Sequence, residues 1–246
     1  MVTRDAIAAG EIATGAGQVL LSIRATRGNP EALKASGDAA SQDFISEQLA
    51  TRYPFDAILS EEAEDDSDRL VNRRVWIIDP LDGTREFSEP PRVDWAVHVA
   101  LVEAGELVAG SVALPGEGLT LSTGDELPHF GPVRSRPRIL VSRTRPTEHA
   151  AMLAETLRGE LIPMGSSGAK AMAVVRGAAD IYLHSGGQWE WDSAAPAAIA
   201  LAAGLHVSRL DGSSLRYNQA NPWLPDILIC RSELAPRVIQ LCRAAA

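Results

Sequence analysis

The first 60 residues change from a helical to an extended hydrophobic pattern. Residues 3–24 are rich in alanine, and their larger apolar residues recur at the spacing of one helix face. A second helical stretch is predicted over residues 39–52, with Asp38 placed as its N-cap. Residues 57–60 form a short apolar run, which predicts the first strand.

The next segment alternates between strands and polar connections. Residues 75–79 predict a second, buried strand, separated from the first by an acidic loop at 61–68. Residues 95–102 and 107–114 are rich in β-forming residues, and the four residues between them, Glu-Ala-Gly-Glu, predict a hairpin loop.

A polar stretch with three prolines, residues 125–137, separates this pattern from a second one and predicts a lobe boundary. We therefore expect an N-terminal α+β lobe over 1–130 and a C-terminal α/β lobe over 131–246. In the second lobe, strands are predicted at 138–142, 160–163, 180–184, 205–209 and 226–230, and helices at 147–158, 169–177, 193–203 and from 234. Such alternation favours a mixed sheet covered by helices.

The composition narrows the class of partner. The chain has 246 residues and a formal charge of −9, which argues against a nucleic-acid polymer because such partners need a basic surface. A small anionic substrate remains compatible if cations bridge it to the protein. The two cysteines, Cys230 and Cys242, have no metal-ligand neighbours and indicate reduced thiols in a cytoplasmic protein. We expect neither a signal peptide nor a membrane span.

Residues 79–84, Asp-Pro-Leu-Asp-Gly-Thr, carry the strongest chemical signal. They deliver Asp79 and Asp82 to the end of a buried strand and then turn. The backbone N–H groups of Gly83 and Thr84 are placed to meet an anion. A turn requires Pro, Asp and Gly, but it does not require a second Asp and a Thr after a buried strand. Acids for a metal beside donors for an anion suggest metal-assisted chemistry on a phosphate ester.

Two further acids follow predicted element ends. Glu61 comes directly after the first strand, and Asp192 precedes an alanine-rich helix. With Asp79, Asp82 and the Leu81 carbonyl, they are oxygen ligands of the kind that Mg²⁺ prefers. The alternatives are a helix cap for Asp192 and for Asp38, and an ordinary solvated loop for the acidic run that begins at Glu61.

The second half contributes small residues at a helix start. Residues 165–170 read Gly-Ser-Ser-Gly-Ala-Lys, which lets the backbone approach an anion but lacks the phosphate-loop pattern of nucleoside triphosphatases. An ordinary loop is the alternative. Trp189 and Trp191 can wall a pocket or belong to the core. The histidines show no zinc spacing and are interpreted as structural or exposed.

These motifs resemble those of the inositol monophosphatase superfamily of lithium-sensitive, Mg²⁺-dependent phosphatases. Residues 79–84 with Phe87 resemble its first signature, residues 191–196 (Trp-Asp-Ser-Ala-Ala-Pro) its second, and residues 60–62 (Ser-Glu-Glu) its upstream element. The three occur in family order across nearly the whole chain. The resemblance implies a layered α-β-α-β-α sandwich with mixed sheets, two or three Mg²⁺ ions and inhibition by Li⁺.

The resemblance also implies roles for individual residues. Glu61 matches a metal ligand that orients the attacking water, and Asp79 and the Leu81 carbonyl match ligands of the first metal. Asp82 and Asp192 match ligands of the second metal.

For the remaining reaction groups, Thr84 resembles the threonine that hydrogen-bonds the water. Asp38 resembles the aspartate that relays the water's proton, although the stretch before it is shorter than in many relatives. The N–H groups of Gly83 and Thr84 match the phosphate cradle.

Within the superfamily, the second half looks most like the 3′(2′),5′-bisphosphate nucleotidases of the CysQ type, which act on 3′-phosphoadenosine 5′-phosphate in sulfate assimilation. Ser166 and Ser167 then belong to the substrate site, and Lys170 is expected to meet the second phosphate. Tyr217 is expected either to stack on the base or to be an ordinary strand-edge tyrosine. Relatives are often homodimers, so a homodimer is a possible assembly.

Three rival functions remain open to test. The first is the same chemistry on inositol 1-phosphate or fructose 1,6-bisphosphate. The second, a haloacid-dehalogenase-type phosphatase, requires Asp-x-Asp, whereas the spacing here is Asp-x-x-Asp. The third is a nucleotide-binding module without catalysis, which the full set of expected ligands disfavours.

Overall fold

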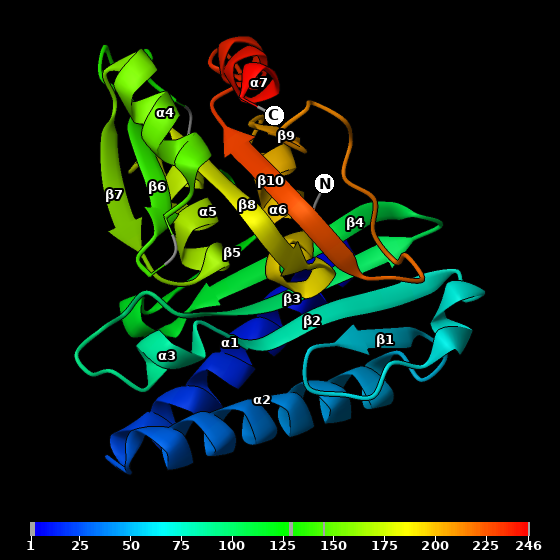
Figure 1. The fold of residues 1–246 in the computed structure, drawn as a ribbon. Helices are drawn as coiled ribbons and strands as arrows, with labels where there is room; N and C mark the ends of the chain where they lie inside the picture. Colours follow the sequence, from blue (N-terminus) through cyan, green and yellow to red (C-terminus); the bar gives the residue numbers. More distant parts are fainter. Residues whose placement is uncertain (1–2, 128–129, 145, 246) are drawn as a thin grey trace.

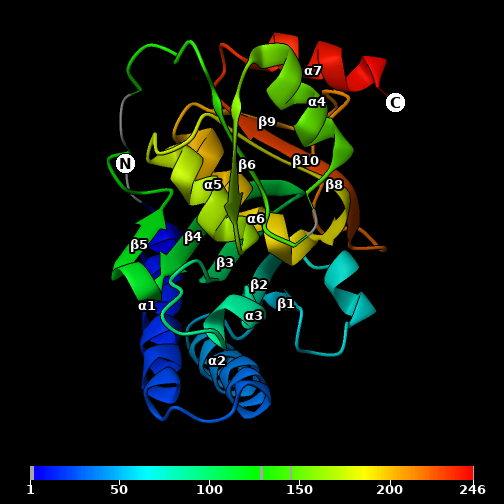
Figure 2. The ribbon, with the colours of Figure 1, turned by 60° about the vertical axis from the view of Figure 1, so that its left-hand side comes forward.

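Two five-stranded sheets alternate with layers of helices through the molecule (Figure 1). The computed structural model describes residues 3–127, 130–144 and 146–245. The helices lie outside each sheet and between the two sheets, and Figure 2 shows the same order of layers from a second direction. The expected α-β-α-β-α sandwich with mixed sheets is confirmed.

The first sheet is built from consecutive strands. Its order is β1-β2-β3-β4-β5, with β1 parallel to β2 and the remaining neighbours antiparallel. The strands are β1 Ala57–Ser60, β2 Arg74–Asp82, β3 Ala96–Glu103, β4 Glu106–Leu114 and β5 Leu119–Ser122. Strand β5 was not expected from the sequence.

The second sheet has a shuffled order, β7-β6-β8-β10-β9. Strand β6 pairs in parallel with β7 and β8, whereas β10 pairs antiparallel with β8 and β9. The strands are β6 Arg138–Ser142, β7 Glu160–Met164, β8 Ile181–Trp189, β9 His206–Ser208 and β10 Trp223–Cys230.

The helices divide by layer. The first sheet is covered by α1 and α2, the space between the sheets is filled by α5 and α6, and the outer face of the second sheet carries α4 and α7 (Figure 1). The bounds are α1 Arg4–Ala25, α2 Pro30–Arg52, α3 Thr84–Phe87, α4 Glu148–Leu157, α5 Ser167–Val175, α6 Glu190–Ala202 and α7 Ala235–Ala244.

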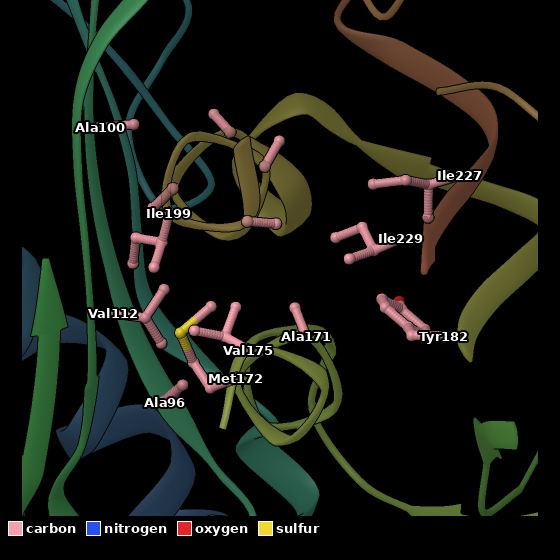
Figure 3. Packing of buried hydrophobic residues seen from close by; sticks show 14 of the residues in the cluster. Ala96, Ala100, Val112, Ala171, Met172, Val175, Tyr182, Ile199, Ile227 and Ile229 are labelled. Carbon is pink, nitrogen blue, oxygen red and sulfur yellow. The ribbon is translucent and has the colours of Figure 1, made fainter. Parts of the chain in front are cut away.

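Strand β3 shows how the layers are built from sequence alternation. Val97, Val99 and Leu101 belong to the cluster under α1 and α2, whereas Ala96 and Ala100 belong to the cluster around α5 and α6 (Figure 3). Successive side chains of a strand point to opposite faces, so β3, which is buried on both sides, carries apolar residues on both faces, with His98 among them. This cluster around α5 and α6 connects the two sheets.

Helix α6 is alanine-rich because it lies between two sheets. A Cβ at Gly110 of β4 would lie 2.6 Å from the Ala198 methyl group and 3.0 Å from the Ala195 carbonyl oxygen. The helix therefore approaches the strand at backbone distance, which only small residues permit. This close approach fixes the start of α6 relative to the first sheet.

Helix α1 has a composition with two interpretations. It is the one helix within the described residues that is long and apolar enough to cross a membrane, which by that criterion departs from the sequence expectation. Its Ile12 and Leu20 side chains are, however, fully buried against neighbouring elements. A core helix passes the same test of length and composition.

Two helix starts were wrong in the sequence interpretation. Helix α2 begins at Pro30 with Asn29 as its N-cap, so Asp38 lies inside the helix and caps nothing. Helix α6 begins at Glu190 rather than after Asp192. Proline at the first helical position and Asn before it are a standard helix start.

The expected boundary at 125–137 falls between β5 and β6, and residues 128–129 within it lie outside the described residues. The division into two lobes stays a prediction, because one hydrophobic cluster includes residues from both sheets.

Candidate active site

Asp79 and Asp82 reach the same face of the first sheet because β2 contains a bulge. Asp79 lies opposite His98 of β3, and Asp82 lies opposite Ala96, so three steps along β2 match two along β3. Residues three apart in a regular strand point to opposite faces. The extra residue reverses this alternation, and both aspartates face α5 and α6.

The start of α5 surrounds the Asp82 carboxylate. Ser166 Oγ donates to Asp82 Oδ2 at 2.5 Å, Ser167 Oγ donates to the same oxygen at 3.0 Å, and Gly168 N donates to it at 2.7 Å. The backbone N–H of Ser167 reaches Oδ1 at 3.1 Å. Ser166 has a positive φ of 49°, an uncommon backbone conformation that occurs at functional sites. The two serines expected at the substrate site thus contact a predicted metal ligand.

His98 lies beneath the aspartates and was missed by the sequence interpretation. It is fully buried, with Nε2 3.1 Å from Asp82 Oδ2 and Nδ1 3.0 Å from the Trp191 carbonyl oxygen. A Cβ at Gly168 would lie 2.1 Å from His98 Nε2, so glycine is required where α5 approaches the histidine. The only available sequence signal was a histidine inside an apolar strand.

Asp192 brings the second half of the chain to this site. It is the third residue of α6, and its Oδ2 accepts a hydrogen bond from Trp189 N at 2.6 Å. One carboxylate oxygen from each of Asp79, Asp82 and Asp192 lies within 4.8 Å of the others. The capping alternative is therefore true of Asp192, but it does not replace the predicted convergence with the other acids.

The pKa values record the crowding of negative charge. Burial and then the charges of Glu61 and Asp82 raise the pKa of Asp79 well above its usual range. Burial and then the charges of Asp192 and Asp82 raise the pKa of Glu61 to about 7. Such like-charge crowding disfavours ionisation of all members at once.

The pKa values of Asp82 and Asp192 shift in opposite directions. Burial opposes the ionisation of Asp82, but the positive charge of His98 and the neighbouring hydrogen-bond donors outweigh it and hold its pKa below the usual range. Burial followed by the charge of Asp82 raises the pKa of Asp192 to about 6. Oxygen donors at this separation and charge suit a hard divalent cation, which would relieve their repulsion.

These groups share a cavity of about 780 Å³. It is lined by Glu61, Asp82, Gly83, Thr84 and Asp192 together with the start of α5 and the ends of β8 and β10. Gly83 has a positive φ of 87° and lies before the single-turn helix α3, which is the turn predicted after the aspartates. Thr84 Oγ1 donates to the Leu81 carbonyl oxygen at 3.1 Å.

Asp38 lies on α2, which packs against the outside of the aspartate turn. A Cβ at Gly37 would lie 3.0 Å from Leu81, and Ser41 Oγ donates to the Pro80 carbonyl at 2.7 Å. Burial and then the charge of Glu62 raise the pKa of Asp38 to about 6. Asp38 therefore lies beside the turn and near the acidic loop 61–68, which we call the Glu61 segment, although it is not a helix cap.

Two expected substrate contacts lie differently. The expected stacking of Tyr217 on the base is wrong. Tyr217 is buried in the core, with its hydroxyl 3.2 Å from Ser193 Oγ, and is not among the residues that line the cavity. Lys170 does line the cavity, but its ammonium donates to the carbonyls of Gly165 and Ser166 at 3.3 and 2.5 Å.

A buried arginine network ties the Glu61 segment to the start of α6. Arg69, 1% exposed, forms a bidentate ion pair with Asp65 at 2.6 and 2.9 Å. Its guanidinium also donates to Asn218 Oδ1 at 2.7 Å and to the Gln219 carbonyl at 3.0 Å.

The network continues into α6 itself. The Glu190 carboxylate accepts hydrogen bonds from the N–H groups of Asn218 and Gln219 at 2.6 and 2.8 Å, and Glu190 precedes Asp192 by two residues. We call Asp65, Arg69, Glu190, Asn218 and Gln219 the Arg69 clasp. No sequence pattern indicated this network, because its members are up to 154 residues apart.

Comparisons with known proteins agree with this geometry. Residues 3–245 match the model of the inositol monophosphatase family. The chain is 49% identical to the 3′-phosphoadenosine 5′-phosphate phosphatase of Mycobacterium leprae, over 97% of this chain and 93% of that protein. It is 51% identical to the protein of the same name from Mycobacterium tuberculosis, over 90% of this chain and 86% of that protein.

A solved structure supports the same assignment. The structure of CysQ from Bacteroides thetaiotaomicron, described as a bacterial member of the inositol monophosphatase family, matches with a TM-score of 0.76 and 26% identity. The match covers 93% of this chain and 97% of that one. With its acidic site assembled from both halves of the fold, this chain belongs to the inositol monophosphatase family.

Proposed function

We propose that this protein is a Mg²⁺-dependent phosphomonoesterase that removes the 3′-phosphate of 3′-phosphoadenosine 5′-phosphate. The observation that carries the proposal is the convergence of Asp79, Asp82 and Asp192 within 4.8 Å of one another. The relatives that are about half identical to this chain carry the name of that activity. A phosphate ester is a small-molecule partner consistent with the net negative charge once cations are bound.

The acidic groups hold the cofactor in this proposal. Glu61, Asp79, Asp82, Asp192 and the Leu81 carbonyl would bind two or three Mg²⁺ ions. When bound, these ions supply positive charge for the phosphate oxygens and lower the pKa of the attacking water. The ionised Asp82, held by the α5 start and His98, keeps one ligand ready for a cation at any physiological pH.

The chain itself orients the water and accepts its proton. Thr84 Oγ1 uses its proton on the Leu81 carbonyl, so its lone pairs are available to accept a hydrogen bond from the water. Asp38, with its pKa raised to about 6, remains ionised at neutral pH while being a stronger base than an ordinary carboxylate. The N–H groups of Gly83 and Thr84 would hold the transferred phosphate.

The second phosphate of the substrate needs a separate cation. Lys170 has a third ammonium donor beyond its two carbonyl contacts. Arg85, exposed at the cavity, has no hydrogen-bond or ion-pair partner for its guanidinium among the described residues. We assign these two side chains to the phosphate that is not hydrolysed.

Phosphate release tests the proposal. Purified protein with Mg²⁺ should release phosphate from 3′-phosphoadenosine 5′-phosphate faster than from inositol 1-phosphate or fructose 1,6-bisphosphate. Removal of Mg²⁺ with a chelator should abolish the release, and Li⁺ should inhibit it. A preference for inositol 1-phosphate would overturn the substrate assignment, and nucleotide binding without turnover of any ester would overturn catalysis.

The cellular setting is part of the same proposal. Cys230 and Cys242 are buried free thiols, in keeping with the cytoplasm as the expected location. Because relatives are often homodimers, we include a homodimer as one possible assembly, which the sedimentation behaviour of the purified protein would test.

A further inference from the structure

Two tryptophans form an exposed pair at the rim of the cavity. Trp189 ends β8 and Trp223 begins β10, and the two residues lie directly opposite each other in the antiparallel ladder. Their ring centroids are 5.1 Å apart, with the planes inclined by 78°. Both residues line the cavity that contains Asp82, Thr84 and Asp192.

The positions of both rings are fixed by their neighbours. Trp189 stacks on Trp191 with centroids 5.2 Å apart and planes 13° from parallel. A Cβ at Gly187 would lie 1.7 Å from the Trp223 ring, and Gly187 has a positive φ of 90°. Glycine at this position therefore leaves the space that the Trp223 ring occupies. The pair is held by packing rather than by a flexible loop.

Exposure of these rings requires an explanation beyond folding. Trp189 and Trp223 remain 39% and 42% exposed, although the burial of large aromatic side chains contributes strongly to stability. Both residues line a cavity that also contains polar and charged groups, among them Thr84, Asp82 and Asp192. An exposed aromatic surface beside a few convergent polar groups is typical of a small-molecule site.

The size of the cavity indicates what the rings contact. In the proposed function, the transferred phosphate group would lie near Gly83 and Thr84 and would fill a small part of the cavity of about 780 Å³. Trp189 and Trp223 offer flat π-surfaces to this cavity. Aromatic side chains bind nucleobases by stacking, without needing a particular hydrogen-bond pattern. A polyol lacks such a planar face.

We propose that Trp189 and Trp223 form the binding surface for the purine base of the substrate. This inference rests on the proposed function and specifies which residues select a nucleotide over other phosphate esters. In this proposal, Trp189 and Trp223 stack on the base, a role that the sequence had suggested for Tyr217, which is buried elsewhere.

Kinetics with two substrates provide the first test. The variants Trp189→Ala and Trp223→Ala are compared with wild type on 3′-phosphoadenosine 5′-phosphate and on 2-glycerophosphate, which has no base. The ratio of kcat/KM for the nucleotide to that for 2-glycerophosphate should fall by about 5- to 150-fold, the factor for one stacked base. The loss should reside in KM, and Trp223→Phe should recover most of it.

Binding of the product gives a readout without turnover. Adenosine 5′-phosphate should quench the tryptophan fluorescence of the wild type, and the quenching should be lost in the two alanine variants. Phe55→Ala is the matched control, because Phe55 is an 89% exposed aromatic residue away from the cavity. Thermal unfolding of each variant identifies any that fail to fold.

The outcomes separate the two proposals. If the wild type does not hydrolyse the nucleotide, the proposed function fails, and the quenching experiment alone decides the base site. If the wild type hydrolyses it and both alanine variants keep the wild-type KM and quenching, the base site is wrong. A change of oligomeric state in the variants, with unchanged KM, would assign the pair to a contact between copies of this chain instead.

Discussion

Asp79 and Asp82 are positioned by one strand, whereas Glu61 and Asp192 are brought together from separate halves of the chain. The first pair lies three residues apart on β2, and a bulge aligns both carboxylates. The second pair lies 131 residues apart in sequence, at the end of β1 and near the start of α6. The first pair depends on local backbone geometry, and the second depends on long-range contacts.

The contacts that hold the two pairs differ accordingly. Asp82 is surrounded by hydrogen-bond donors from the α5 start and by His98. The segments that carry Glu61 and Asp192 are joined through the Arg69 clasp, between the acidic loop and α6. A substitution at Asp82 on β2 should therefore lower the rate of hydrolysis directly. A substitution in the Arg69 clasp should instead change how well Glu61 and Asp192 are held near each other.

The largest effect is expected from Asp82→Asn. The substitution keeps the side-chain shape but removes the charge from the best-ionised member of the site. If Asp82 binds Mg²⁺ as proposed, its loss should lower kcat/KM by more than about 100-fold, the upper range for residues that only support a metal ligand. Phosphate release at saturating Mg²⁺ measures it, and a similar melting temperature shows that the fold persists. Near-normal rates would show that Asp82 binds no essential metal.

His98 joins the two regions, because its ring lies between Asp82 and the Trp191 carbonyl. His98→Asn removes the contact that orients Asp82 and should weaken Mg²⁺ binding by roughly 10- to 100-fold, as do other residues that support metal ligands. Isothermal titration of the metal-free protein with Mg²⁺ gives the measurement. Unchanged affinity would mean that the α5 donors alone hold Asp82.

The clasp is broken by Arg69→Met. Removing one partner of a buried ion pair costs about 3–5 kcal/mol, and Asp65 is partly exposed, so the lower end is expected here. Because the lost contacts join the Glu61 segment to α6, Mg²⁺ affinity should fall together with the melting temperature, whereas Asp82 keeps its own contacts.

Arg176→Met is the matched control for the clasp. Arg176 pairs with Glu117, and both side chains are about 30% exposed, so its loss should cost no more than about 1 kcal/mol and leave Mg²⁺ affinity alone. If Arg69→Met lowers stability but not Mg²⁺ affinity, the clasp supports only the fold.

The smallest effect is expected in the pH dependence of stability and of Mg²⁺ affinity, which arises from Glu61. The pKa of Glu61 rises from 4.5 to about 7 in the folded, metal-free protein. The folded state then binds the extra proton, so this contribution to stability is complete below about pH 4.5 and is lost as the pH rises through about 7. Mg²⁺ competes with that proton, so its affinity should increase over the same range.

Thermal unfolding with and without Mg²⁺ at pH 6 and pH 8 measures this competition. The increase in melting temperature on adding Mg²⁺ should be larger at pH 8, and Glu61→Gln should reduce the difference between the two pH values. An equal increase at both pH values would mean that the Glu61 proton does not compete with the metal.

Much of the fold and most of the acidic site follow from local sequence patterns. The run of β-forming residues in β3 and the helical spacing in α1 are short-range signals, because they can be recognised within a few neighbouring residues. The segment 79–84 likewise signals its turn through Pro, Asp and Gly. Errors arose where a nearby alternative was equally good locally: Asp38 resembles an N-cap, but Asn29 and Pro30 begin the helix.

The sequence by itself determined which acids this protein carries, the order of its strands and helices apart from β5 and α3, and the turn that presents Gly83 and Thr84. Only the tertiary structure decided that Asp79 and Asp82 face the same way, that His98 lies beneath them, and that Arg69 joins two remote segments. The reason is physical: bulge register, burial of a polar ring and a long-range ion pair are set by what packs against a residue, and that neighbour is distant in the chain.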